Sequence, residues 1–222
     1  MKQTICDNLK KIKNETPENV LLVAVSKTKP NSDIMSAYAC DQRDFGENKV
    51  QELVAKHEQL PQDIRWHMIG HLQRNKVKYI APFVFLIHSV DNLKLLKEIE
   101  KQAAKHQRQL QVLLQIKIAK EDTKFGMDEE TLHTIITQYQ AGEFPNVRIK
   151  GLMGMATNTD DTIQIASEFA YLHRLYIKSK SQLKEMEYLS MGMSHDYKIA
   201  ITHGSNLIRV GSAIFGARNY SI

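Results

Sequence analysis

One lysine and one arginine lie at or within apolar runs that could be parallel strands, where reactive side chains are often found. Lys27 closes the apolar run LLVAVSK (21–27), and Arg209 lies inside the apolar run NLIRVGSAIF (206–215). A partly desolvated lysine can form a Schiff base with an aldehyde, although most lysines after a strand simply enter solvent. An arginine that points inward needs an acceptor or an aromatic ring, and otherwise it pairs with an acid outside the sheet. Both alternatives are open for each residue.

Small polar residues near the C-terminus could bind an anion. Gly192 and Ser194 belong to the loop after the run EYLSMGM (187–193), and Gly211 and Ser212 lie in the last apolar run. Glycine allows a ligand close to the backbone, and exposed N–H groups attract phosphate. Ordinary loop and capping chemistry would explain the same residues. The pattern therefore allows a phosphate site without requiring one.

Several other kinds of site lack their motifs. His67 and His71 are four residues apart, but no third ligand has a suitable spacing, so we expect no metal site. The chain has no GxSxG, Walker or HExxH motif. Ser194, His195 and Asp196 are adjacent in the sequence, which is not how a catalytic triad is built.

The composition is typical of one soluble globular domain. The 222 residues are 42% hydrophobic and 25% charged, with 30 Lys plus Arg against 25 Asp plus Glu, a net charge of +5. No apolar run approaches the ~18 residues of a transmembrane helix, and the N-terminus lacks the features of a signal peptide. Because acids are interspersed among the lysines, we expect neither a specific nucleic-acid partner nor a membrane.

The number and spacing of the two cysteines bear on whether the protein is in a reducing or an oxidising compartment. Cys6 and Cys40 are too few for a disulfide framework, and they form no CxxC motif. A reducing, cytoplasmic location is the simplest interpretation.

Eight apolar, β-branched runs alternate with helix-like stretches. Several runs are almost continuously apolar, which suits strands buried on both faces of a parallel sheet. Strands are predicted at 21–27, 43–48, 66–70, 85–90, 112–118, 149–155, 187–193 and 206–215. Helices are predicted at 2–14, 31–40, 47–57, 72–79, 91–106, 128–141, 160–180 and 195–203.

The spacing of these runs predicts one barrel. Each predicted strand starts 19 to 38 residues after the previous one, which leaves room for a crossover between parallel strands. Eight βα units in 222 residues indicate a (β/α)8 barrel, preceded by a helix and lead-in over residues 1–20. The alternative is an open doubly wound sheet. Its nucleotide-binding form favours GxGxxG after the first strand, where this chain has SKTKPN.

The chain also resembles the pyridoxal-phosphate homeostasis protein family, which is also called the YggS/PROSC family. The resemblance implies an α/β fold: a single-domain (β/α)8 TIM barrel over residues 1–222, of the alanine racemase N-terminal-domain type known as fold-type III. It therefore favours the barrel over the open sheet. The matching segments occur in the family's order and are LLVAVSKTKP (21–30), FGENKVQE (45–52), WHMIGHLQRNK (66–76), IHSVD (87–91), KFGM (124–127), GLMGMA (151–156), LSMGMSHD (189–196) and IRVGSAIFGAR (208–218).

The resemblance implies roles for particular residues. Lys27 would hold pyridoxal 5'-phosphate (PLP) as a Schiff base, and Lys29, having left the strand, would face away. Asn48 would lie beside the 3-hydroxyl of the ring, and Arg209 would face the pyridine nitrogen. Because arginine only donates hydrogen bonds, it discourages protonation of that nitrogen and restrains carbanion chemistry. The remaining cofactor-binding residues would be His67 and Met155 in the pocket lining, and Ser194, Gly211, Ser212 and Ser190 at the phosphate.

The resemblance implies an intracellular carrier and regulator of PLP, with apo PLP-dependent enzymes as candidate recipients. Only seven residues follow Phe215, whereas alanine racemases have a second, β-rich domain that supplies a catalytic tyrosine. We therefore expect a protein that is not an enzyme and has no catalytic residue. The alternative is a small PLP enzyme, an amino-acid racemase or decarboxylase. The helices show no long apolar stripe beyond what the barrel covers, so we expect a monomer.

Overall fold

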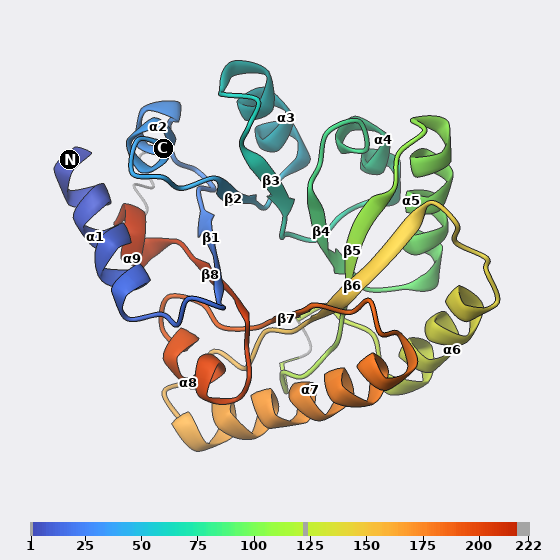
Figure 1. Cartoon of the computed structure of the whole chain (residues 1–222). Helices are drawn as coiled ribbons and strands as arrows, with labels where there is room; N and C mark the ends of the chain where they lie inside the picture. The colour runs from blue at the N-terminus through green and yellow to red at the C-terminus, as the bar shows by residue number, and fades with distance from the viewer. Residues whose placement is uncertain (1, 122–123, 217–222) are drawn as a thin grey trace.

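Eight parallel strands form a closed barrel, in which each strand pairs with its neighbour in chain order and β8 returns to β1 (Figure 1). The structure is a computed structural model, and it describes residues 2–121 and 124–216. The closure confirms the predicted (β/α)8 barrel and excludes the open sheet. The strands are β1 (Leu21–Val25), β2 (Asp44–Glu47), β3 (Arg65–Met68), β4 (Leu86–Val90), β5 (Leu110–Gln115), β6 (Val147–Met153), β7 (Tyr188–Ser190) and β8 (Leu207–Val210).

The helices form an outer layer around the strands (Figure 1). Every predicted helix is present. The ends lie within three residues of their predicted positions, except that the α-helix predicted from residue 72 begins at Val77, after a 3-10 turn. They are α1 (Lys2–Asn14), α2 (Asn31–Tyr38), α3 (Val50–Gln59), α4 (Val77–Ile80), α5 (Leu93–Lys105), α6 (Glu129–Gln140), α7 (Thr162–Gln182), α8 (Tyr197–Thr202) and α9 (Ser212–Phe215), with a 3-10 turn at Arg74–Lys76.

The eighth strand is shorter than predicted. β8 ends at Val210, and Ser212–Phe215 form the short helix α9 instead of continuing the strand. An apolar run such as SAIF fits a buried strand and a buried helical turn equally well. The turn packs against α1, where Asn8 Nδ2 donates to the carbonyl of Ile214 at 3.0 Å. As a result, Gly211 lies at the strand–helix junction.

The barrel interior contains an apolar set and a polar set of buried side chains, and β4 and β8 contribute to both. Its apolar part consists of buried residues from five strands, namely Val23, Leu86, Leu113, Met153 and Leu207. Its polar part consists of side chains that are less than a tenth exposed, namely Asp44, His67, His88, Ser190 and Arg209. A second apolar layer, which includes Trp66 and Phe169, fills the space between strands and helices. The polar part of the interior leads towards the C-terminal ends of the strands.

The two cysteines are paired. A disulfide joins Cys6 of α1 to Cys40, which follows α2, with 5.8 Å between the Cα atoms. One bridge is not a framework, but the expectation of a reducing compartment receives no support from this pair.

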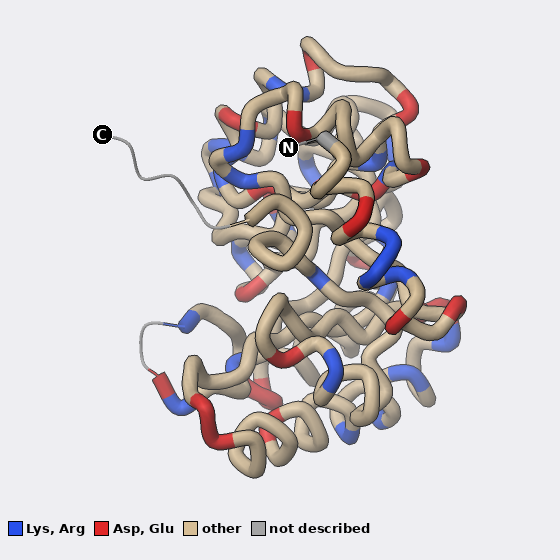
Figure 2. The backbone as a smooth tube through the Cα atoms, turned by 90° about the vertical axis from the view of Figure 1, so that its left-hand side faces the viewer, with Lys and Arg blue, Asp and Glu red and all other residues tan. Residues whose placement is uncertain are grey.

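The charged residues are mixed over the surface. Basic and acidic positions are interspersed along the backbone in Figure 2, as the sequence predicted. In the part of the chain that the structure describes, no helix is both long and apolar enough to span a bilayer.

Candidate functional site

The C-terminal ends of the strands surround a cavity of about 230 Å³. Active residues of (β/α)8 barrels gather at this end. Seven of the residues singled out in the sequence line the cavity, namely Lys27, Asn48, Met155, Ser194, Arg209, Gly211 and Ser212. The rest of its described lining consists of Val25, Lys29, Ile69, Met193, His195 and Gly216. The fold thus brings together residues from both halves of the chain.

Two of the predicted cofactor-binding residues lie outside the described lining of the cavity. His67 and Ser190 are fully buried in the barrel interior and do not belong to the cavity lining. Side chains of a strand alternate between its two faces, so the next inward-facing residue after His67 is Ile69, and Ile69 is the one that lines the cavity. Ser190 instead contacts Arg209 from below the lining.

A buried ion-pair cluster, formed by Glu47, Glu52 and Lys56, fixes the end of β1. Lys56 Nζ lies 2.7 Å from one carboxylate oxygen of Glu47 and 2.7 Å from one of Glu52. The same ammonium donates to the carbonyl of Ser26 at 2.8 Å, and the Ser26 hydroxyl donates to Glu47 at 2.6 Å. Burial raises the pKa of Glu47 to about 7, although Lys56 opposes this rise. The residue before Lys27 is therefore held by both its hydroxyl and its carbonyl.

The residue after Lys27 is held as well. Thr28 has a φ of 63°, a left-handed conformation that costs a non-glycine residue about 1 kcal/mol or more. Its backbone N–H donates to Glu52 at 2.6 Å. The ion-pair cluster thus stabilises the turn on both sides of Lys27.

This turn also redirects Lys29, which was predicted to face away. Lys29 lines the cavity, and its Nζ donates to the carbonyls of Phe215 and Gly216 at 3.0 and 3.3 Å. The backbone N–H of Lys29 donates to the carbonyl of Ser26 at 3.0 Å, so the chain folds back towards the cavity. The prediction for Lys29 was wrong.

Arg209 points inward and is 4% exposed. Its Nη1 donates to the carbonyl of Ser190 at 3.0 Å and to the Ser190 hydroxyl at 2.5 Å, and its Nη2 donates to the carbonyl of Gly154 at 3.1 Å. Burial lowers the pKa of Arg209 to about 10, and nearby Asp196 opposes this. None of the ion pairs among the described residues includes Arg209. A buried cation without a paired acid favours an acceptor or anionic ligand in the cavity.

Backbone donors and hydroxyls converge beside Arg209. Ser194 Oγ accepts hydrogen bonds from the N–H groups of Gly211 and Ala213 at 3.2 and 3.5 Å. A Cβ on Gly211 would lie 3.2 Å from both the carbonyl oxygen and the Cβ of Val25, so a side chain would crowd this strand end. Together with the Ser212 hydroxyl, these groups offer several donors to one small anion.

The lining provides one group suited to acid–base chemistry besides its lysines. His195 lines the cavity, and the described lining has no tyrosine, cysteine or carboxylate. In the sequence, His195 was noted only beside Ser194 and Asp196. Its position in the loop after β7, where barrels carry their active residues, indicates a site residue. In the described parts of the chain, no three His, Cys, Asp or Glu residues are grouped so that they could hold a metal ion.

The sequence matches a family model and several curated proteins. The model for the N-terminal domain of alanine racemase matches residues 2–219. A pyridoxal phosphate homeostasis protein of Vibrio alginolyticus is 39% identical over 211 residues, covering 93% of this chain and 90% of that protein. The protein of the same name from Aquifex aeolicus is 38% identical and covers 90% of this chain and 87% of its own length.

Solved structures show the same barrel. PipY of Synechococcus elongatus is 34% identical, and its structures without PLP and with PLP bound have TM-scores of 0.90 and 0.87, covering 96% of this chain and all of PipY. Alanine racemase of Bartonella henselae, at 14% identity, shares only the fold, with a TM-score of 0.73 over all of this chain and 61% of the racemase. The chain therefore belongs to the pyridoxal phosphate homeostasis protein family, within the family of alanine racemase N-terminal domains.

Proposed function

We propose that this chain binds PLP in the cavity and acts in PLP homeostasis, by buffering the cofactor or supplying it to other proteins. The observation that carries the proposal is that Lys27 lines one cavity of about 230 Å³ together with the buried Arg209, which forms no ion pair among the described residues. An anionic aldehyde with a ring acceptor would satisfy both groups. The names of the relatives, and the PLP bound to PipY, support the same assignment.

The residues of the cavity fit the parts of the cofactor. The Lys27 amine would add to the aldehyde carbon and release one water as the C=N bond of the Schiff base forms. The Arg209 guanidinium would donate to the ring nitrogen, and the Asn48 amide would contact the 3-hydroxyl. Met155 would pack on the ring. The phosphate would take the donors at Ser194, Gly211 and Ser212. When bound, PLP supplies an electrophilic aldehyde and an electron-withdrawing ring.

The arrangement favours a carrier over a committed enzyme. Arg209 can only donate, so it favours the unprotonated ring nitrogen, which withdraws electrons poorly. His195 is the observation that favours the alternative of an amino-acid racemase or decarboxylase, because such chemistry needs an acid or base near the Cα atom.

The test of PLP binding is a Schiff-base map. Purified protein with PLP should develop the visible absorbance of the Schiff base, and borohydride reduction followed by peptide mapping should place the adduct on Lys27. Lys27→Ala should lose the adduct. Lys29→Ala is the matched control, because Lys29 lines the same cavity, and it should keep the adduct on Lys27. A protein that stays colourless with excess PLP, or an adduct found only on Lys29, would contradict the proposal.

The enzyme alternative has its own test. Wild type and His195→Ala are incubated with D- and L-alanine in deuterated water, and Cα exchange is followed by NMR. For a carrier, exchange should not exceed that of free PLP in either protein. Exchange well above that level, lost in His195→Ala, would establish the alternative and identify its acid–base residue.

The proposed setting is a monomer in the cytoplasm that hands PLP to apo PLP-dependent enzymes. The mixed surface charge supports a freely diffusing protein. Light scattering gives the mass in solution, with 25.5 kDa expected. Recovery of activity by an apo-enzyme mixed with the loaded protein, faster than with the same concentration of free PLP, would demonstrate transfer.

A further inference from the structure

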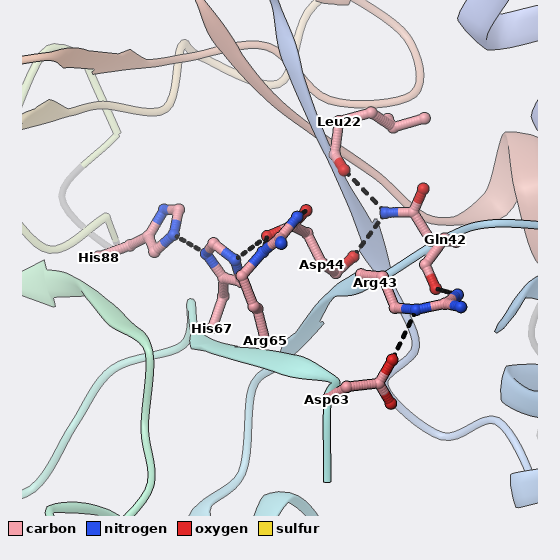
Figure 3. A network of polar contacts seen from close by, with 8 residues as sticks. All are labelled: Leu22, Gln42, Arg43, Asp44, Asp63, Arg65, His67 and His88. Carbon is pink, nitrogen blue, oxygen red and sulfur yellow. Dashed lines mark hydrogen bonds and ion pairs between the residues drawn. The ribbon is translucent and has the colours of Figure 1, made fainter. Parts of the chain in front are cut away.

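A chain of polar side chains crosses the barrel interior and ends at Arg209. We call it the interior polar chain: Asp44, His67, His88, Ser190 and Arg209. His67 Nε2 lies 3.0 Å from Asp44 Oδ1, and His67 Nδ1 lies 2.9 Å from His88 Nε2. Figure 3 shows His67 between Asp44 and His88. His88 Nδ1 lies 3.3 Å from the Ser190 hydroxyl, which accepts from Arg209 Nη1. Four strands besides β8 thus connect to the arginine of the cavity.

The far end of the interior polar chain is fixed by charge. Arg65 donates through Nε to Asp44 Oδ1 at 2.7 Å and through Nη2 to Asp44 Oδ2 (Figure 3). Burial alone would raise the pKa of Asp44, but hydrogen bonds from Arg65 and His67 lower it below its usual value. Asp44 is therefore a carboxylate and only accepts hydrogen bonds.

With Asp44 as a fixed acceptor and a neutral His67 ring, one arrangement of protons satisfies the interior polar chain. Asp44 accepts from His67, so Nε2 of His67 carries the hydrogen, and in the neutral ring Nδ1 is an acceptor. His88 must then donate from Nε2, which leaves its Nδ1 as an acceptor for the Ser190 hydroxyl. Because the Ser190 hydroxyl donates its proton to His88, its oxygen can only accept a hydrogen bond from Arg209.

The neutral state of His88 follows from its surroundings. It is fully buried. Burial lowers its pKa well below the usual value, and the charge of Arg209 lowers it further. A charged His88 would donate from both nitrogens, so the Ser190 hydroxyl proton would lose its acceptor and its fixed direction. The neutral ring is the form that fixes the direction of the Ser190 proton.

We propose that Asp44, His67, His88 and Ser190 act as positioning residues that hold the Arg209 guanidinium aimed at the cavity through hydrogen bonds of a single orientation. The consequence for PLP rests on the proposed function. Since a buried cluster of aliphatic side chains and methionine already fills part of the barrel interior, polar residues are not needed to fill this space. A serine hydroxyl with a fixed proton restricts the rotation of Arg209, and a correctly placed donor costs less to reorganise when a ring nitrogen binds.

The first test locates the hydrogens on the two histidine rings by NMR, and it needs no cofactor. Long-range ¹H–¹⁵N NMR of the histidine side chains, recorded on the protein without PLP near neutral pH, distinguishes the two tautomers from the doubly protonated ring. Both rings should carry hydrogen on Nε2 and none on Nδ1. A hydrogen on Nδ1 of either ring, or a protonated His88, would overturn the proposed orientation.

The second test compares two serine-to-alanine changes in fully buried positions. Ser190→Ala removes the hydroxyl acceptor of Arg209 and leaves the carbonyls of Ser190 and Gly154 in place. Ser89→Ala is the matched control, because Ser89 is equally buried and its hydroxyl has no hydrogen-bond partner among the described residues. We expect Ser190→Ala to raise the Kd for PLP about tenfold and to shift the absorption maximum of bound PLP. Ser89→Ala should leave both within twofold of wild type.

The outcomes separate this inference from the proposed function. If wild type binds PLP on Lys27 but Ser190→Ala matches Ser89→Ala in both Kd and spectrum, the positioning role is refuted and PLP binding stands. If wild type binds no PLP, the proposed function fails, and the tautomers of His67 and His88 still decide whether the orientation exists. A spectral shift on Ser190→Ala distinguishes positioning from loss of packing, because a merely loosened core would not change the environment of the ring.

Discussion

The loop that carries Asn48 can be tested through the glycine that packs against it. A Cβ built on Gly70 would lie 2.3 Å from the carbonyl oxygen of Asn48 and 2.7 Å from its Cα. Both are backbone atoms, so no side-chain rotation can relieve the contact. An ordinary contact is about 3.4 Å, and Gly70→Ala must therefore move the backbone at Asn48 by about 1 Å relative to the end of β3.

This displacement has two expected effects. Overpacking of this kind costs about 1–3 kcal/mol of stability, which urea denaturation would measure. A shift of about 1 Å is also enough to break the hydrogen bond of Asn48 to a ligand, worth about 1 kcal/mol, so the Kd for PLP should rise roughly fivefold. The Schiff base on Lys27 should still form, because its turn is held by the separate ion-pair cluster. Spectroscopic titration with PLP measures the affinity in protein shown by circular dichroism to be folded.

The matched control is Gly142→Ala. Gly142 has a φ of +82°, but a Cβ there would meet no atom within 4 Å. It should lose about 1 kcal/mol of stability from backbone strain and keep wild-type affinity for PLP. The reasoning is refuted if Gly70→Ala binds PLP as wild type does, or if Gly142→Ala weakens binding as much.

Three further predictions concern stability, each measured by urea denaturation. The pKa of Glu47 is about 7 in the folded chain against 4.5 ordinarily, so the folded state holds an extra proton between these pH values. Its contribution to the free energy of unfolding, up to about 3 kcal/mol, should be present below pH 4.5 and lost as the pH rises to 7, and Glu47→Gln should flatten this dependence; parallel curves would contradict the assignment. Phe169→Ala, in the fully buried core, should cost about 3–5 kcal/mol, and a loss below 1 kcal/mol would mean that the core there is not packed as described. Asp161 caps α7 by accepting from the N–H groups of Ile163 and Gln164, so Asp161→Ala should cost about 1 kcal/mol, whereas a loss of the same size from the exposed Asp160→Ala would show that the cap is not the cause.

The sequence predicted the eight strands and their helices because each unit carries its own signal. A buried parallel strand is a short apolar run, and the helices between are amphipathic. The same signal failed at Ser212–Phe215, where an apolar run after β8 forms a helical turn. Periodicity cannot distinguish the two in so short a segment. Packing of α9 against α1 decides it, and α1 lies at the other end of the sequence.

The site was predictable where a motif marks it and unpredictable where backbone geometry decides. Lys27 stands at a strand end in AVSKTKP, and the structure places it in the cavity. Lys29 could not be placed, because its direction depends on the positive φ of Thr28, which threonine rarely adopts. A threonine therefore gives no sequence signal of the turn, whereas a glycine would have done so.

The sequence contains a pattern that indicates the interior polar chain, namely a polar residue within each of five strands. Asp44, His67, His88, Ser190 and Arg209 all lie within strands and are all buried. A single polar residue in a strand can be explained by an ion pair with a charged side chain outside the barrel. Five of them, on five different strands of a closed barrel, are explained more simply by contact with one another inside it. The predicted topology was sufficient for that inference, because strands that face one axis bring their inward residues together.

Strand β2 contributes one residue to the interior polar chain and another to the ion-pair cluster. Its four residues, Asp44–Glu47, are all buried, and alternate side chains face opposite sides of the barrel wall. Asp44 faces inward and begins the interior polar chain that ends at Arg209, while Glu47 faces the helices and joins the ion-pair cluster beside Lys27. The two networks share no residue. The aldehyde end and the ring end of a bound cofactor would therefore be positioned by independent sets of contacts, so loosening one would leave the other in place.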